Sequence, residues 1–387
     1  SSQVSRTIAS AVGWGIIQIL VKKLLELIVI WRWTMDINDL LRKTAELSGT
    51  DLHLTVNLPP MVRIDSILHP LGDQVLTADD TASMAAEILP KTQESIFKSQ
   101  LNADFSFGVP GLGRFRANVY LQRGSVALAI RRLPFDVPSS EELGLPKIVT
   151  DLAKKKRGMV IVTGPTGSGK STTLASMVRT INDSFRYHII TLEDPIEYTF
   201  KHSLSIVNQR EVGNDVLSFS EGLRAALRED PDVVMLGEMR DLASISAALT
   251  LAETGHLVLT TLHTKSAAES VDRIVDVFPP NQQQQVRTQL STVLEGIISQ
   301  RLMPKKGGGL VLAYEILIAT PAVRSLIRDG KTHQIPSSIQ TGTAFGMVTM
   351  ENRLFELIQK RYIDVEQALE MANYPDVLKR LIDAQKK

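Results

Sequence analysis

The stretch GPTGSGKST, Gly164 to Thr172, decides the fold that the sequence predicts. It fits the phosphate-loop pattern G-x-x-x-x-G-K-[ST], with the apolar strand 159–163 before it and a helical stretch after it, as the pattern requires. Its three glycines allow backbone N–H groups to close around phosphates, and the helix N-terminus adds a favourable dipole. A chance glycine-rich turn is the alternative, and the flanking strand and helix argue against it.

Two side chains of this loop have predicted roles. Lys170 reaches the β- and γ-phosphates of a nucleotide, and the Ser171 hydroxyl binds Mg²⁺. The sequence therefore predicts ATP and Mg²⁺ as ligands. The predicted nucleotide contacts are Gly164, Pro165, Thr166, Gly167, Ser168, Gly169, Lys170, Ser171 and Thr172.

Outward from the loop, the apolar runs MVIVT, HIITL, DVVML and HLVLTTL alternate with helical stretches, which is typical of a parallel sheet covered on both faces. Strand 233–236 ends at Gly237, where nucleotide-hydrolysing sheets usually place an aspartate that helps to hold magnesium. The next residue, Glu238, is free to act on the attacking water as a general base or orienter. A surface carboxylate paired with Arg240 or Arg228 is the alternative.

Two other predicted strands have candidate catalytic residues next to their ends. Glu193, Asp194 and Glu197 follow strand 188–192, while His256 precedes strand 257–262 and His263 follows it. We predict catalytic roles for Glu193, Glu197, His256 and His263 beside Glu238, with structural histidines as the alternative. The two histidines do not share a metal ion on this interpretation, because the extended strand between them is roughly 20 Å long.

The amino-acid composition limits which partners and which metal sites the protein can have. The 387 residues are 43% hydrophobic and 22% charged, with a net charge of +1 and no cysteine. This balance gives no reason to expect a nucleic-acid partner, and it excludes disulfides and thiolate metal sites. We predict a small mixed α+β domain over 35–132, a Pro/Ser-rich linker over 133–147, and an α/β domain over 148–387 that becomes helical from about residue 320.

Residues 1–34 form an apolar segment that charged residues interrupt, and its longest uncharged run, 7–21, is too short to span a bilayer. One interpretation places this segment outside the working protein, because the pattern of the first domain starts at Met35. The other makes it an interfacial amphipathic helix that holds three residues at headgroup level, Trp31, Arg32 and Trp33.

The first domain and the linker are rich in arginine. In a ring of subunits, one or two of these side chains could reach the γ-phosphate of a neighbour as arginine fingers. A solvated strand face is the alternative for each one. The candidates are Arg114, Arg116, Arg123, Arg131 and Arg132.

The residues discussed above belong to four motifs that follow one another along the chain: GPTGSGKST, ITLEDPIEY, VVMLGEMRD and TGHLVLTTLHT. In this order and spacing they resemble the Walker A motif, Asp box, atypical Walker B motif and His box of the secretion and type IV pilus ATPases. The resemblance covers about residues 35–387. The segment TPAVRSLIRDGKTHQIPSSIQTG, 320–342, is similar to the C-terminal signature of the pilus retraction ATPases, with departures at Val323, Ser325 and Asp329.

This resemblance implies a PAS-like N-terminal domain, a RecA-like P-loop ATPase domain with a helical C-terminal part, and ATP bound between the subunits of a hexamer. It implies a cytoplasmic motor at the inner face of the cytoplasmic membrane, which acts on the pilus platform protein, drives pilus retraction and allows peripheral membrane association. Family roles carry over to Lys170, Ser171, Glu193, Glu197, Glu238, His256 and His263.

Three rival functions remain open in the sequence. An assembly or type II secretion ATPase usually has a four-cysteine zinc site, which a chain without cysteine cannot build. A type IV secretion ATPase would lack the segment 320–342. An accessory paralogue or non-hydrolysing scaffold does not need both Lys170 and Glu238.

Overall fold

The computed structural model describes residues 36–64, 67–133 and 137–385 of the chain. It divides into two compact units, one ending at Leu133 and the other beginning at Pro134. Residues 1–34, for which two interpretations stand open, lie outside the described part. No helix within the described part is long and apolar enough to cross a membrane.

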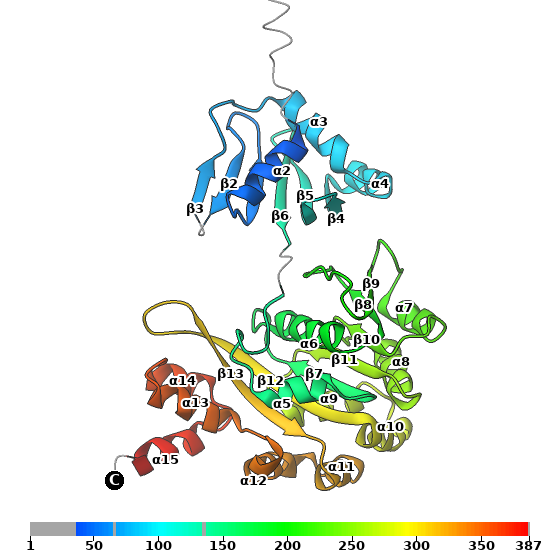
Figure 1. The fold of residues 1–387 in the computed structure, drawn as a ribbon, viewed down its shortest axis with the longest axis vertical. Helices are drawn as coiled ribbons and strands as arrows, with labels where there is room; N and C mark the ends of the chain where they lie inside the picture. Colours follow the sequence, from blue (N-terminus) through cyan, green and yellow to red (C-terminus); the bar gives the residue numbers. More distant parts are fainter. Residues whose placement is uncertain (1–35, 65–66, 134–136, 386–387) are drawn as a thin grey trace, which may run out of the picture. The chain divides into compact units, whose positions relative to one another are not determined.

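The first unit is a sheet covered by helices on one face. Its helices are α2 (Ile37–Glu46), α3 (Ala78–Ile88) and α4 (Lys91–Gln100). Its strands are β1 (Asp51–Leu54), β2 (Met61–Ile64), β3 (Ile67–Pro70), β4 (Asn102–Val109), β5 (Gly113–Gln122) and β6 (Ser125–Arg132). Among the described residues these strands form an antiparallel six-stranded sheet in the order β3-β2-β1-β6-β5-β4 (Figure 1).

The period-2 pattern of the strands gives this unit its core. Leu52 and Leu54 of β1 are fully buried with Phe115 of β5, against the apolar faces of the helices. At the start of α3, Asp80 N–H donates to Thr77 Oγ1 at 3.2 Å, and Thr77 N–H donates to Asp80 Oδ2 at 2.8 Å. This capping box satisfies backbone groups that the first turn of a helix leaves unpaired.

The second unit is built on strands β7 (Gly158–Thr163), β8 (His188–Glu193), β9 (Ile206–Glu211), β10 (Val233–Leu236), β11 (Leu257–Leu262), β12 (Leu294–Pro304) and β13 (Leu310–Ile318). In the described chain they form one sheet in the order β13-β12-β7-β11-β10-β8-β9, parallel except for β13. The sequence patterns do not predict β9 and β12, because polar residues interrupt the apolar run of each.

Helices cover both faces of this sheet (Figure 1). The helices of this unit are α5 (Lys147–Ala153), α6 (Lys170–Ser184), α7 (Phe219–Ala226), α8 (Leu242–Glu253), α9 (Ala267–Asp276), α10 (Pro280–Val293), α11 (Pro321–Arg328), α12 (Ile335–Thr341), α13 (Met350–Gln359), α14 (Val365–Met371) and α15 (Pro375–Gln385), with short 3-10 turns η1 (Thr332–Gln334) and η2 (Thr343–Phe345).

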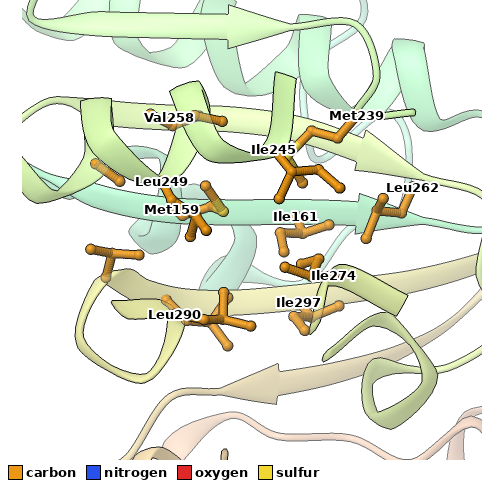
Figure 2. Packing of buried hydrophobic residues seen from close by; sticks show 14 of the residues in the cluster. Met159, Ile161, Met239, Ile245, Leu249, Val258, Leu262, Ile274, Leu290 and Ile297 are labelled. Carbon is orange, nitrogen blue, oxygen red and sulfur yellow. The ribbon is translucent and has the colours of Figure 1, made fainter. Parts of the chain in front are cut away.

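The alternation of side chains along β7 fixes which helices lie on which face. Met159 and Ile161 point to the side covered by α7 to α10, and Figure 2 shows Ile245 and Leu249 of α8 lying over them. The intervening Val160 and Val162 point to the side covered by α5 and α6. Both faces of β7 are therefore dry, which explains its continuous apolar sequence.

Most of the segment predicted as a linker packs on the second unit. Leu145 is buried in its core, and Ser140 Oγ lies 2.8 Å from Ser176 Oγ of α6. The chain from Val137 onward therefore belongs structurally with the seven-stranded sheet, and a fragment that begins at residue 148 would lose these contacts.

Thr320, Pro321 and Gly330 predict a short helix over about 321–329, and its helical spacing places Arg324, Ser325, Arg328 and Asp329 on the outward side. Helix α11 forms there, and Thr320 caps its N-terminus with an N–H···Oγ1 bond from Val323 of 3.4 Å. The expectation that Arg324 points outward is wrong. Its guanidinium donates to the carbonyl oxygens at the end of α10 and to Glu295 at the start of β12. The acceptors are Ser291 O at 2.8 Å, Thr292 O at 2.7 Å, Ala319 O at 2.9 Å and Glu295 Oε1 at 2.9 Å.

We predict that Arg324→Ala lowers the free energy of unfolding by roughly 1–3 kcal/mol, because it leaves several partly buried acceptors unpaired. Arg328→Ala, on the exposed side of the same helix, should change it by less than about 0.5 kcal/mol. Thermal melting of both variants checks this. Equal melting temperatures would show that the Arg324 contacts add nothing to stability.

A buried carboxylate, Glu315 of β13, joins the sheet to the C-terminal helices. It accepts hydrogen bonds from Ala267 N–H at 2.8 Å and from Asn373 Nδ2 at 3.2 Å. Burial is the largest cause that raises its pKa to about 7, and the nearby carboxylate of Glu351 adds to this. The folded state therefore holds the Glu315 proton more tightly than the unfolded chain does.

This pKa shift predicts a pH dependence of stability. For a raised carboxylate pKa, the stabilisation is fully present below the ordinary value of 4.5 and is lost as the pH rises through about 7. The melting temperature of the wild type relative to Glu315→Gln should therefore fall between pH 5 and pH 8. The exposed Glu370→Gln serves as the control. A constant difference across this range would contradict the burial argument.

Candidate active site

The phosphate loop joins β7 to α6 and has the backbone shape of an anion cradle. Gly164, Gly167 and Gly169 have φ angles of 151°, 78° and 85°, and residues other than glycine rarely adopt such angles. A Cβ at position 164 would also lie 2.3 Å from the carbonyl oxygen of Gln300. The loop shape therefore requires glycine, and the loop ends at the N-terminus of α6, where the first backbone N–H groups of a helix have no partner within the helix.

Lys170, the first residue of α6, lies folded over this loop. Its Nζ donates to Gly164 O at 2.9 Å and to Pro165 O at 3.0 Å, and the side chain is buried. Burial lowers its pKa, while the carboxylates of Glu238 and Glu197 act in the opposite direction. The ammonium is therefore held at the cradle by carbonyl oxygens that an incoming phosphate can replace.

Glu238 stands just past the end of β10, next to the strand that leads to His263. Its Oε1 lies 2.5 Å from Arg240 Nη2 and its Oε2 lies 3.3 Å from His263 Nε2. The ion pair with Arg240, which was expected if Glu238 were a surface carboxylate, is thus present. Glu238 is nevertheless only 9% exposed, and it lines the cleft beside the phosphate loop. Its two partners fix its orientation toward that cleft.

The carboxylates after β8 lie in two different environments. Glu193 is buried and accepts hydrogen bonds from Thr191 Oγ1 at 2.6 Å and Gln209 Nε2 at 3.0 Å. Desolvation raises its pKa and the hydrogen bonds oppose this. Glu197 is exposed at the mouth of the same cleft. Glu193 is therefore suited to hold the loop after β8, and Glu197 to meet a ligand.

One cleft of about 580 Å³ unites most of the predicted residues. Its volume is in the range of small-molecule and cofactor sites. Thr166, Gly167, Gly169, Lys170, Ser171 and Thr172 line it together with Glu193, Asp194, Glu197, Glu238 and His263. A basic glycine-rich cradle beside a wall of carboxylates fits a nucleotide that carries Mg²⁺, with the Ser171 hydroxyl as the metal ligand from the loop.

His256 is not brought to this cleft. It lies at the amino end of β11, whereas His263 follows the carboxyl end, and its Nδ1 lies 3.0 Å from Leu251 O. Within one chain His256 therefore lies away from Glu238, and its catalytic role stays a prediction. No group of three or more histidine or acidic side chains placed to hold a metal ion occurs within the described ranges.

The five candidate arginines all lie in the first unit, on β5, β6 and the turn between them. Arg116 of β5 pairs with Arg131 of β6 across the sheet, on the face away from the helices. Arg131 Nε donates to Asp51 Oδ1 at 2.8 Å, whereas Arg116 is exposed and has no ion-pair partner among the residues that the structure describes. Arg123 lies in the turn, at the other end of both strands.

Sequence reasoning missed three residues of the site. Tyr198 OH lies 3.0 Å from Thr172 Oγ1, Arg240 pairs with Glu238, and Gln300 supports the phosphate loop from β12. Arg240 had appeared only as a surface partner. A polar pair, Ser299-Gln300, inside the apolar run of 294–304 is the signal that could have drawn attention to Gln300.

Comparison with known proteins agrees with this geometry. Residues 140–308 match the family described as type II/IV secretion system protein. The type IV pilus retraction ATPase PilT of Pseudomonas aeruginosa is 47% identical over 342 residues, which cover 88% of this chain and 99% of PilT. A twitching motility protein of Neisseria gonorrhoeae is also 47% identical, over 80% of this chain and 83% of its own length.

A solved structure extends the agreement to three dimensions. The crystal structure of the pilus retraction motor PilT with bound ADP is 51% identical to this chain and superposes with a TM-score of 0.83. The match covers 89% of this chain and 99% of that one, and it confirms the predicted fold class, an N-terminal domain followed by a P-loop ATPase domain. The chain belongs to the PilT family of type IV pilus retraction ATPases.

Proposed function

We propose that the chain is the subunit of a homohexameric motor that hydrolyses ATP with Mg²⁺ and drives disassembly of a type IV pilus, and with it twitching motility. The motor works in the cytoplasm, at the inner face of the cytoplasmic membrane, and acts on the pilus platform protein. Its similarity to a pilus retraction ATPase and to a twitching motility protein supports pilus retraction, and the ADP bound to the related pilus retraction motor supports nucleotide binding.

The single observation that carries the chemistry is the shared cleft of Lys170 and Glu238. Lys170 leaves its carbonyl partners for the β- and γ-phosphates, where its charge offsets the charge that develops during transfer. The Glu238 carboxylate accepts the proton of the attacking water, or orients that water toward the γ-phosphate. Arg240 and His263 hold the carboxylate in place until then.

Mg²⁺ would supply positive charge that offsets the charge of the phosphates. Ser171 is the residue of the loop that would hold it. Gly237 offers no carboxylate at the position where related sheets place an aspartate.

The exposed side of α11 is the part of the chain that we assign to transmission rather than to chemistry. Arg328 and Asp329 are exposed there, Lys331 follows them, and none of the three lines the cleft. Because Arg324 is a structural contact, a test of transmission needs Arg328→Ala with Lys331→Ala, which leaves the α10–β12 junction intact.

Steady-state phosphate release by the purified chain tests the catalytic part of this proposal. We expect ATP-dependent release that EDTA abolishes and excess Mg²⁺ restores. A chain that binds ATP but releases no phosphate under any of these conditions would be a nucleotide-binding scaffold, and the proposed function would be wrong.

A further inference from the structure

Gln300 of β12 contacts the phosphate loop at both ends. Its side-chain Nε2 donates to Ser168 O at 2.7 Å, and its Oε1 accepts from Thr173 Oγ1 at 3.0 Å. Its backbone carbonyl oxygen packs against Gly164, where a Cβ would approach it to 2.3 Å. One residue therefore supports the loop from its first glycine to the first turn of α6.

This support is buried, and both polar ends of the side-chain amide are hydrogen-bonded. Gln300 is 1% exposed and Thr173 is 2% exposed, so water cannot replace either side-chain contact without opening the core. A buried amide that satisfies both of its polar ends specifies one arrangement, because each alternative leaves unpaired groups behind. The loop is thus tied to a strand of the sheet as well as to its own helix.

Gln300 does not line the nucleotide cleft. It lies one residue beyond the last register pair of β12 with β7, Ser299 with Thr163, at the point where β7 ends and the loop begins. Any effect of Gln300 on the nucleotide must therefore pass through the shape of the loop. That makes it a positioning residue rather than a catalytic one.

We propose that Gln300 holds the phosphate loop in its nucleotide-receiving shape before the nucleotide arrives. The inference rests on the proposed nucleotide-binding function of the cleft, and it deepens that function by assigning β12 a part in it. Without the two side-chain hydrogen bonds the loop populates other shapes. The apparent affinity for nucleotide then equals the intrinsic affinity multiplied by the fraction of molecules whose loop can still receive the nucleotide.

This mechanism predicts a separation of two kinetic constants. A bound nucleotide orders the loop itself, so the turnover number at saturating ATP should fall less than the affinity does. We expect Gln300→Met, which keeps the length of the side chain and removes both hydrogen bonds, to raise the dissociation constant for ADP and the KM for ATP by about 10-fold or more. Its kcat should stay within about threefold of the wild type.

The matched control is Ser299→Ala at the neighbouring position. Ser299 is equally buried, and its Oγ has no hydrogen-bond partner among the described residues. This variant should bind a fluorescent ADP analogue as the wild type does. Thr173→Val, which removes one of the two hydrogen bonds from the other side, should weaken binding in the same direction as Gln300→Met but by less.

Gln300→Glu supplies a readout that simple packing would not move. A protonated glutamate has the shape of glutamine and can donate to Ser168 O, whereas the ionised form cannot. Its affinity for the ADP analogue should approach the wild-type value at low pH and fall toward that of Gln300→Met as the pH rises. Melting curves at each pH show that the variants are folded.

The outcomes separate the inference from the proposed function. If the wild-type chain does not bind the analogue, the proposed function fails. If the wild type binds it and Gln300→Met, folded as judged by melting, binds equally well, the positioning role of Gln300 is overturned. An affinity of Gln300→Glu that follows the wild-type pH profile at every pH would also overturn it.

Discussion

Glu238→Gln should bind ATP with near wild-type affinity and hydrolyse it roughly 10²-fold or more slowly. The amide keeps the shape of the side chain and can still meet Arg240 and His263, which lie 2.5 Å and 3.3 Å from the carboxylate oxygens. It cannot accept the proton of the attacking water. The loss therefore falls on turnover and spares binding, which depends on the phosphate loop.

Phosphate release and binding of a fluorescent ATP analogue, measured on the same preparation, check this result. Glu221→Gln, at an exposed carboxylate of α7, is the control that should leave both quantities unchanged. Lys170→Ala should show the opposite pattern and lose affinity first. Hydrolysis by Glu238→Gln at the wild-type rate would remove Glu238 from the chemistry.

Arg116→Ala should lower ATP turnover by roughly 10³-fold if the first unit completes the active site of a neighbouring subunit. Of the five candidate arginines, Arg116 is exposed on the open sheet face and has no ion-pair partner in the described chain, whereas Arg131 is held by Asp51. A side chain without an internal partner is the one best suited to meet a phosphate. Binding of nucleotide to the isolated subunit should be unaffected.

Mixing subunits tests whether this contact acts between chains. Arg116→Ala subunits added to wild type should lower activity more steeply than the wild-type fraction predicts, because each defective arginine disables a neighbour's site. Arg42→Ala, at an exposed arginine of α2 that is not among the candidates, is the control and should leave turnover unchanged. Activity proportional to the wild-type fraction would mean that each chain supplies its own site.

The features that could be predicted from sequence are those with a local physical signature. The phosphate loop needs glycine at positive φ. The strands of the sheet beside it need continuous apolar runs, because helices cover both faces of the sheet. The carboxylates after strands could be expected to meet because parallel strands present their carboxyl ends at one edge. Glu193, Glu238 and His263 meet there for that reason.

The features that could not be predicted depend on contacts between distant segments. Gln300 lies 132 residues from Ser168, and nothing in its own segment indicates that β12 lies next to β7. Helical spacing placed Arg324 on an outer face, but the carbonyl oxygens at the end of α10 lie close enough to bind it. His256 shared a motif with His263, and the direction of β11 separates them.

The most direct test of the central claim, that ATP hydrolysis at Glu238 drives pilus retraction, is twitching motility in cells that lack this chain. Complementation with the wild type should restore twitching, and Glu238→Gln at the same expression level should not, although it binds ATP. Full twitching with Glu238→Gln would contradict the claim, because the cells would then retract pili without the chemistry assigned to this site.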